Sequence, residues 1–490
     1  MTALLPHPDR LFPADPGERD IARRLYAEVA DAPIYSPHGH VDARLLLDNN
    51  HFPDPAALLI TPDHYALRLL HAVGVPLDQL GVRPVGASGA GASSAAAAAS
   101  AAASTETSVS GREIWRRLCE NWNVFLGTPV RYWFETEFSS VFGLAEHPSP
   151  ASADALYDQL VETLATEEFR PRALFERFRI AVLATTDDPA DDLAAHLALR
   201  NDPTFAGRVV PTFRADRYMH ANETAWPANL ERLGAVSGID TSTYAGLLEA
   251  LRSRRAYFAA AGATATDTGV VDAGSEPLEV ADAERLHAAA LRGSLSAGEA
   301  TAYRHNMLYQ LAAMASEDGL VMQLHPGVLR NHHQPTFDRF GPDTGHDLPE
   351  PTHYTRPLTP ILRDFGTNST FRLVLFTVDE TAFSREIAPL AGFYPSVYAG
   401  APWWFLDSPA GIARYRSAIT DSAGFTKTSG FIDDTRAFCS IPARHDMSRR
   451  SDAAYLASLV SSHQVSEDNA VGIARRLVGE IPVSTFRLAE

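Results

Sequence analysis

The sequence of 490 residues contains very little cysteine, since Cys119 and Cys439 are the only two. Two thiols do not form a disulfide framework of the kind that secreted domains use. The first residues contain neither a basic segment nor a long apolar run of the secretory type. We therefore expect a cytoplasmic protein without disulfides.

Long apolar runs and positive charge are also scarce. No stretch reaches the roughly 18 uninterrupted apolar residues of a membrane-spanning helix, so we expect no membrane contact. The 42 Lys and Arg residues stand against 60 Asp and Glu, which gives a formal net charge of −18. This charge suits a polyanion poorly and argues against nucleic acid as a partner. An anionic small molecule is compatible with it where arginines cluster locally.

Residues 86–111 consist mainly of Ala, Ser, Gly and Thr. This composition offers little apolar surface to bury, and it predicts a mobile surface segment. The segment lies inside a longer stretch, 45–177, whose periodic parts are of helical type. With 45% hydrophobic residues the chain can bury a large core. We expect one catalytic domain over residues 1–490 with a mostly helical insertion.

Short apolar runs of strand character alternate with helical spans along the chain. There are eight such runs, over residues 32–35, 180–187, 209–214, 265–272, 320–325, 371–379, 397–405 and 429–434. Eight alternating units are the number in a (β/α)8 barrel of the TIM type, whose active site lies at the carboxyl ends of the strands. The predicted fold class is therefore α/β, with the helical insertion after the first strand.

His38-Gly39-His40 follows the first of these runs. Two imidazoles one residue apart at a strand end point to the same side and can bind one metal ion. Taken alone, such a pair is more often found on a surface or in a cap. The last run, however, also ends in ligand-type residues, Asp433 and Asp434, followed by Arg436. This pairing indicates a closed barrel with one metal at its mouth.

Arg214, Arg330 and Arg436 follow predicted strands. An arginine inside a barrel mouth must find an anion or stay unpaired at a high cost in free energy. Each arginine taken singly could equally be a solvated surface residue. Together they indicate a bound carboxylate or phosphate, and the lack of a Gly-rich phosphate loop favours the carboxylate.

Other polar and aromatic residues at these positions have two readings each. His325 ends the fifth run and could be structural or functional. His64 and Tyr65 open a helix and could serve capping and packing alone. Trp403 could belong to the core or form a wall of a sugar-sized pocket. Asp188 precedes a proline, which favours a cap or a turn.

These motifs resemble the uronate isomerase (glucuronate isomerase) family of the amidohydrolase superfamily. The resemblance extends from about residue 9 to residue 450, and the order of the motifs is more specific than any one of them. The matching motifs are Arg24-Leu25-Tyr26, Pro33-Ile34 with His38-Gly39-His40, Asp63-His64-Tyr65 with Arg68, Thr185 to Pro189, Pro211 to Asp216, Met322 to Asn331, Trp403 to Asp407, Asp434-Thr435-Arg436, Arg444-His445 and Arg449-Arg450.

The resemblance implies a metal site and a reaction. His38, His40 and Asp434 would hold one divalent ion, commonly zinc. The reaction would be the reversible aldose–ketose isomerisation of D-glucuronate to D-fructuronate, or of D-galacturonate to D-tagaturonate. The residues implied to act in catalysis are Asp434, Arg436, Tyr65 and His64, and those implied to bind the uronate are Arg214, His325, Trp403 and Arg330. Either Tyr65 or Asp434 could be the proton-transfer base.

The chain departs from the family pattern at three places. It has Asp272-Ala273-Gly274 where the family usually has a His after the Asp, Pro37 in place of a Tyr, and Asp433 to Arg436 in place of Thr-Asp-Ser-Arg. A mononuclear metal-dependent hydrolase or deaminase of the same superfamily is the main alternative. Such enzymes usually need a further histidine near the sixth strand, and 371–379 has none. A non-catalytic sugar-acid binding protein is a third hypothesis, and a homo-oligomer is compatible with all three.

Overall fold

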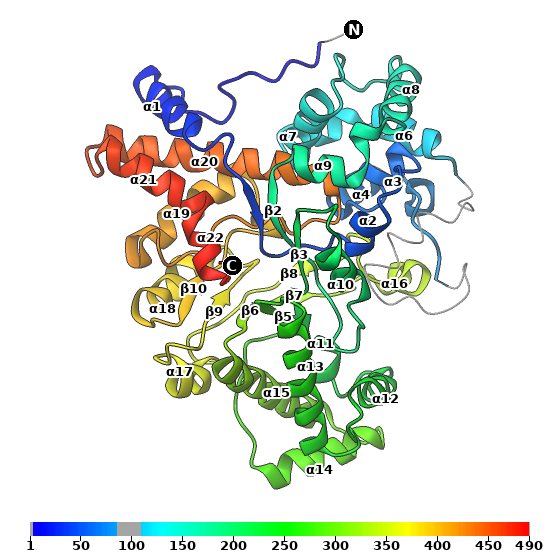
Figure 1. Ribbon diagram of the computed structural model, residues 1–490, viewed down its shortest axis with the longest axis vertical. Coiled ribbons are helices and arrows are strands. Elements are labelled where there is room, and N and C mark those ends of the chain that lie inside the picture. Colours follow the sequence, from blue (N-terminus) through cyan, green and yellow to red (C-terminus); the bar gives the residue numbers. More distant parts are fainter. Residues whose placement is uncertain (1–2, 86–108, 490) are drawn as a thin grey trace.

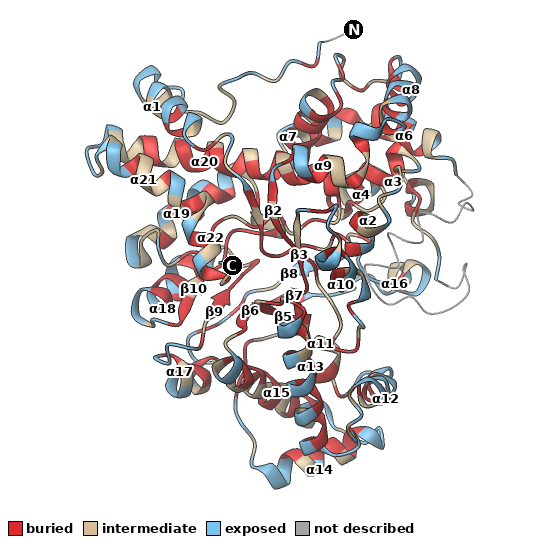
Figure 2. Ribbon diagram, in the orientation of Figure 1, coloured by how far each residue is buried: buried red, intermediate tan, exposed pale blue. Residues whose placement is uncertain are grey.

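The structure is a computed structural model that describes residues 3–85 and 109–489. Its strands gather at the centre of the molecule and helices surround them (Figure 1). The strands are mostly buried, whereas the outer faces of the helices are exposed (Figure 2). Parallel strands covered in this way are what an α/β fold requires.

The central strands pair in parallel in two series. The first series, in the order β1-β2-β3, contains β1 (Ile34–Ser36), β2 (Ile180–Ala184) and β3 (Arg208–Val210). The second, in the order β10-β9-β6-β5-β4, contains β4 (Phe213–Arg214), β5 (Ala265–Val270), β6 (Val321–Pro326), β9 (Leu373–Leu375) and β10 (Val397–Ala399). An isolated parallel bridge between Asp187 and Phe213 links the two.

β3 and β4 are one interrupted strand, because only Pro211 and Thr212 separate them. Proline has no N–H to donate, so the hydrogen-bond ladder breaks there. With β3 and β4 counted as one strand, each of the first seven predicted runs contains an observed strand. The predicted α/β barrel class is confirmed. Most of the strands are shorter than predicted.

The eighth predicted strand is wrong. Within the described residues 429–434 no strand forms, and only Thr428 makes an isolated bridge, to Ala399. Gly430 has φ +73° and Asp434 has φ +42°, and both values take the backbone out of the extended conformation. This last segment meets the first at a hydrogen bond of 3.0 Å from the His40 N–H to the Thr435 carbonyl.

All the named elements between β1 and β2 are helical, and they lie together at the upper right of Figure 1. Trp115, Trp133 and Phe138 are part of the apolar core in this region. The helices are α2 (Ala43–Asp48), α3 (Pro55–Leu59), α4 (His64–Ala72), α6 (Gly111–Glu120), α7 (Pro129–Thr136), α8 (Ala153–Leu164) and α9 (Pro171–Arg177), with the short turns η1 (Leu77–Leu80), η2 (Trp122–Phe125), η3 (Glu137–Val141) and η4 (Glu167–Phe169).

The predicted mobile segment falls almost entirely outside the described residues, which resume at Val109. Its last residue, Gly111, is the first of α6, and Ser110 is the N-cap of that helix. The Ser110 Oγ accepts the N–H of Glu113, and the Glu113 carboxylate accepts the N–H of Ser110 in return. This capping box sets the start of the helix.

The remaining helices follow or separate the strands. They are α1 (Pro16–Ala27), α10 (Ala194–Asn201), α11 (Asp216–Met219), α12 (Trp226–Ser237), α13 (Tyr244–Ala260), α14 (Val280–Leu291), α15 (Ala297–Asp318), α16 (Gln334–Phe340), α17 (Thr359–Phe365), α18 (Ala388–Phe393), α19 (Pro409–Ala423), α20 (Ile441–Ser461), α21 (Glu467–Val478) and α22 (Glu480–Thr485), with the short turns η5 (Phe383–Ile387), η6 (Trp404–Leu406) and η7 (Phe438–Ser440). A hairpin of β7 (Val328–Leu329) and β8 (Leu348–Pro349) follows β6.

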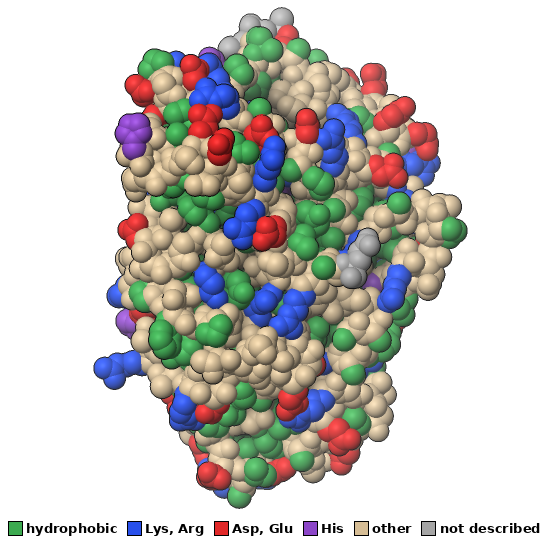
Figure 3. Space-filling view, turned by 60° about the vertical axis from the view of Figure 1, so that its left-hand side comes forward, with side chains coloured by type: hydrophobic (Ala, Val, Ile, Leu, Met, Phe, Trp, Pro, Cys, Tyr) green, Lys and Arg blue, Asp and Glu red, His purple; other side chains and the backbone are tan. Residues whose placement is uncertain are grey.

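The surface mixes charges of both signs. On the face drawn in Figure 3, acidic and basic side chains are interspersed with apolar ones. Within residues 3–85 and 109–489, no helix is long and apolar enough to cross a membrane. Both cysteines are buried free thiols, and burial raises the pKa of Cys119 to about 12.

Candidate active site and metal centre

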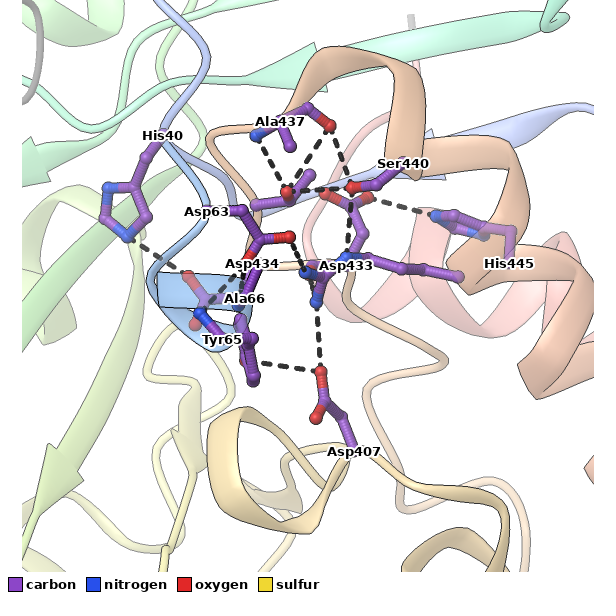
Figure 4. A network of polar contacts seen from close by, with 12 residues as sticks. His40, Asp63, Tyr65, Ala66, Asp407, Asp433, Asp434, Ala437, Ser440 and His445 are labelled. Atoms are coloured by element: carbon purple, nitrogen blue, oxygen red, sulfur yellow. Dashed lines mark hydrogen bonds and ion pairs between the residues drawn. The ribbon is translucent and has the colours of Figure 1, made fainter. Parts of the chain in front are cut away.

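His38, His40 and Asp434 meet just beyond the carboxyl end of β1. The Nε2 atoms of His38 and His40 lie 3.3 and 3.1 Å from Oδ1 of Asp434. One ligand atom from each of the three lies within 4.8 Å of the others, and no other group of described residues has this spacing. Figure 4 shows His40 directed at the Asp434 carboxylate. We refer to these three residues as the His-His-Asp cluster.

The backbone around this cluster explains how residues so distant in sequence meet. The His40 N–H donates to the carbonyl of Thr435, and the Thr186 hydroxyl donates to the carbonyl of Gly39 at 2.9 Å. Asp434 adopts a left-handed conformation that Asp tolerates better than most residues. The ends of three strand segments are thereby tied together around the cluster.

A divalent cation fits these residues. Oδ1 of Asp434 and Nδ1 of His38 are buried and make no hydrogen bond to any described residue. Both imidazole nitrogens lie close to this carboxylate oxygen without hydrogen-bond geometry, and three such atoms can share one cation. Two His and one carboxylate are also a common ligand set for zinc in sites that keep an open position.

A second group of charges surrounds Asp267 in the middle of β5. Asp267 is fully buried, with Oδ1 2.7 Å from Nε2 of His325 and Oδ2 3.1 Å from Nη1 of Arg214. The Nε of Arg214 also donates to Asp216 at 2.8 Å, and Asp216 accepts the Gly269 N–H at 2.9 Å. We call Asp267, Arg214, Asp216 and His325 the Asp267 network.

The charges in this network control the ionisation of Asp267. Burial alone would raise the pKa of this carboxyl, but His325, Arg214 and His38 outweigh burial and hold the pKa far below its usual range. His325 and His38 lie close to each other, with their ring centroids 6.4 Å apart. The Asp267 network and the His-His-Asp cluster are therefore adjacent.

Asp267 was not predicted as a site residue, because it lies inside a strand and not at its end. Asp272, at the end of the predicted run, contacts His305 at 2.7 Å and the Gly274 N–H at 2.9 Å. A signal was nevertheless present, because a carboxylate inside an apolar strand must be paired. Asp188 proves to be a turn former, since it accepts from the Ala190 N–H and the Tyr218 hydroxyl.

The other two predicted arginines contact carboxylates from the segment between β7 and β8. Nη2 of Arg436 lies 3.1 Å from Asp343, and Nη1 of Arg330 donates to Asp347 at 2.9 Å. Asp343 is also 3.9 Å from Arg330, and its side chain is 45% exposed. These arginines do meet anions, but the anions belong to the chain itself.

Aromatic side chains line the space beside the cluster. Trp403 is buried, with its ring centroid 4.8 Å from that of His325 and 6.5 Å from that of His38. Its indole N–H is buried and has no hydrogen-bond acceptor in the described part of the chain.

His64 and Tyr65 are positioned by the start of α4. The Asp63 carboxylate accepts the N–H groups of Tyr65 and Ala66 at 2.8 and 3.3 Å, which caps the helix. The two rings stack at 4.5 Å. Burial, reinforced by the charge of Arg436, lowers the pKa of His64 to about 3, so its imidazole is neutral.

The predicted site residues thus lie near one another, and Arg330 is connected to Arg436 through Asp343. Asp343, Asp407 and Arg444 complete the surroundings and were not recognised as site residues from the sequence. Asp407 and Arg444 lie within two of the motifs that the chain shares with the family, Trp403 to Asp407 and Arg444-His445, and these motifs could have indicated them. Asp343 lies in a loop, Gly341 to Asp347, that periodicity does not describe.

Comparison with known proteins gives a consistent result. The glucuronate isomerase family matches residues 17–81 and 100–483. Uronate isomerase of Corynebacterium efficiens is 48% identical over 488 residues, covering 99% of this chain and 100% of its own length. That of Rhizorhabdus wittichii is 48% identical over 482 residues, covering 98% of each. The crystal structure of glucuronate isomerase from Caulobacter crescentus has a TM-score of 0.94 at 41% identity, covering 100% of this chain and 98% of that one.

Proposed function

The chain belongs to the glucuronate isomerase family, and we propose that its isomerase chemistry takes place between the His-His-Asp cluster and the Asp267 network. The observation that carries this proposal is the meeting of both groups at one end of the parallel strands. The substrates are uronates, converted from D-glucuronate to D-fructuronate and from D-galacturonate to D-tagaturonate. The reaction takes place in the cytoplasm, within a single catalytic domain.

The cluster supplies a site for one divalent ion, most simply zinc. Such an ion, when bound, polarises a carbonyl or binds vicinal oxygens of the sugar acid, an effect of several kcal/mol on the transition state. His38, His40 and Asp434 provide its ligands. Trp403 and His325 lie beside His38, so the sugar would lie next to these two rings.

The isomerisation also needs a group that moves a proton between C2 and C1 and a group that stabilises the enediolate. Asp434 and Tyr65 are the candidates for the proton transfer. Arg436 stabilises the negative charge that develops on oxygen. His64 is neutral and stacks on Tyr65, so it can donate to the substrate without adding charge.

The substrate carboxylate is bound by arginine side chains. Arg214 and Arg330 each carry more donors than their partners in the chain use. A uronate carboxylate would accept hydrogen bonds from the remaining N–H groups of these two arginines. A neutral aldose would leave those donors unused and bind weakly.

Incubation of the purified protein with glucuronate and with galacturonate, followed by detection of the keto acids, tests the proposal. Metal content is measured on the same sample. Formation of both keto acids supports a uronate isomerase. Bound metal with hydrolysis of an ester or amide but no keto acid would favour the hydrolase alternative, and uronate binding without turnover would favour the binding protein.

A further inference from the structure

Asp407 contacts the hydroxyl group of Tyr65. In Figure 4 the Tyr65 side chain lies between the carboxylates of Asp434 and Asp407. The Tyr65 hydroxyl donates to Oδ2 of Asp407 at 3.3 Å, and both side chains are buried. Tyr65 is thus connected to a carboxylate that is not part of the His-His-Asp cluster.

Arg444 fixes this carboxylate in place. Its Nη1 donates to the same oxygen, Oδ2 of Asp407, at 3.1 Å, and its guanidinium lies 3.7 Å above the ring of Trp133. The same Nη1 also donates to the carbonyl of Asp433 at 3.3 Å. Arg444 therefore couples Asp407 to the segment that carries Asp434.

The bonding of Asp407 is incomplete for a carboxylate with a purely structural role. Oδ1 of Asp407 is buried and has no hydrogen-bond partner within the described ranges. Asp452 provides the comparison, because its two oxygens accept from Nε and Nη2 of Arg416 at 2.6 and 2.9 Å. Buried polar atoms are usually satisfied in this way, so the free oxygen of Asp407 calls for an explanation.

The ionisation of the two groups suits proton uptake by Asp407. Burial raises the pKa of Asp407 well above its usual value, because the nearby charges of Asp434 and Asp63 add to the effect and Arg444 compensates it only in part. Burial also raises the pKa of Tyr65, so its hydroxyl is protonated before the reaction. The charge of Arg444 and the hydrogen bond from Tyr65 favour the ionised form of Asp407 before the reaction, and burial increases the affinity of that carboxylate for a proton.

We propose that Asp407, held by Arg444, is a relay residue that exchanges a proton with Tyr65 during the isomerisation. As the proton leaves the substrate it binds to the Tyr65 oxygen, while the Tyr65 O–H bond breaks and its proton goes to Oδ2 of Asp407. Tyr65 stays neutral, and one negative charge moves from Asp407 to the substrate, beside Arg436. The reverse transfers return the proton to the neighbouring carbon. This inference rests on the proposed function.

Asp407→Asn tests the relay, because the amide retains the shape but not the ability to take up a proton. We expect kcat to fall by about 10²-fold with KM within about threefold, the scale of a lost acid–base contribution. Tyr65→Phe interrupts the same step, so the double variant should be no slower than Tyr65→Phe alone. The matched control is Asp452→Asn, which also removes a buried carboxylate from an arginine but should leave kcat unchanged.

Three results would overturn the relay: a normal kcat in Asp407→Asn, an effect that multiplies with that of Tyr65→Phe, or an equal loss of kcat in the control. If Asp407→Asn does not fold, isotope effects on the wild type decide. With C2-deuterated glucuronate, the relay requires a solvent isotope effect on kcat together with the carbon isotope effect. A carbon effect alone contradicts it. Wild-type protein without uronate turnover contradicts the proposed function itself, and the relay with it.

Discussion

The His-His-Asp cluster and the Asp267 network are adjacent but electrostatically opposite. In the cluster, Oδ1 of Asp434 faces two imidazole nitrogens and accepts no hydrogen bond from a described residue. In the network, Asp267 has an arginine and a histidine at hydrogen-bonding distance. The cluster contains no arginine or lysine and so favours a cation from outside, whereas in the network Arg214 supplies the positive charge from the chain itself. The two neighbouring carboxylates are thus balanced in different ways.

The largest effect should follow from a change in the cluster. We expect Asp434→Asn to lose bound metal and to reduce turnover by about 10³-fold or more, since the metal contributes several kcal/mol to the transition state. Metal per chain and initial rates on glucuronate check this result. Asp272→Asn is the control, because Asp272 pairs with His305 away from the cluster. Full metal occupancy in Asp434→Asn would place the ion elsewhere.

In the Asp267 network the main effect should be on stability. We expect Asp267→Asn to lower the free energy of unfolding by about 3 kcal/mol, because it breaks a buried ion pair and leaves Arg214 with Asp216 alone. The pKa of Asp267 is depressed in the folded protein, so its contribution is present above pH about 4 and is lost as the pH falls.

Urea unfolding of the wild type and of Asp267→Asn at pH 7 measures this cost, and the same measurement at pH 3 should give a smaller one. The exposed pair of Arg285 and Glu299 supplies the control, and Glu299→Gln should cost less than about 1 kcal/mol. Equal costs for Asp267→Asn and Glu299→Gln would mean that the buried network contributes no more than a surface pair.

Arg436 follows the cluster in sequence and pairs with Asp343, which belongs to neither group. Arg436→Met removes a charge-assisted contact of about 1.5 to 3 kcal/mol, which corresponds to roughly 10- to 150-fold in kcat/KM for uronates. Arg285→Met on the surface should change nothing. An unchanged kcat/KM in Arg436→Met would contradict the stabilisation of the enediolate by this arginine. Turnover of glucose as fast as glucuronate by the wild type would contradict carboxylate binding by Arg214 and Arg330.

The smallest effect concerns Asp187, a carboxylate that pairs with no described arginine or lysine and is not one of the proposed metal ligands. Asp187 accepts from Thr185 at 2.6 Å and from the Thr212 N–H, and burial raises its pKa to about 7. The folded state then binds more protons than the unfolded state between pH 4 and 7, so this group destabilises the protein as the pH rises. Relative to wild type, Asp187→Asn should gain about 2 kcal/mol of stability between pH 5 and pH 7.

Unfolding at pH 5 and pH 7 of the wild type and of Asp187→Asn measures this effect. His196 touches the same Thr185 and has its pKa lowered to about 4, which acts in the opposite direction. The comparison must therefore be made between variants rather than on the wild type alone. A difference in stability that is independent of pH would show that Asp187 is ionised in the folded protein.

Much of the site was predictable because its signals are local. His38-Gly39-His40 directly follows a strand, and in an extended segment two histidines with this spacing point to the same face. Asp267 was missed because its importance depends on Arg214 and His325, which come from other strands. The role of Asp343 depends on a loop that packs closely on α4, where a side chain at Gly345 would lie 3.1 Å from Arg68.

By itself the sequence determined the alternation of strands and helices, the presence of His and Asp ligands, and membership of an isomerase family. These follow from hydrophobic periodicity and residue chemistry, which act over a few positions. The tertiary structure alone decided which charges neutralise each other, that residues 429–434 turn instead of forming a strand, and that Asp407 contacts Tyr65. The reason is physical: the pairing of charges and the burial that shifts a pKa depend on distances between segments hundreds of residues apart, which no local pattern contains.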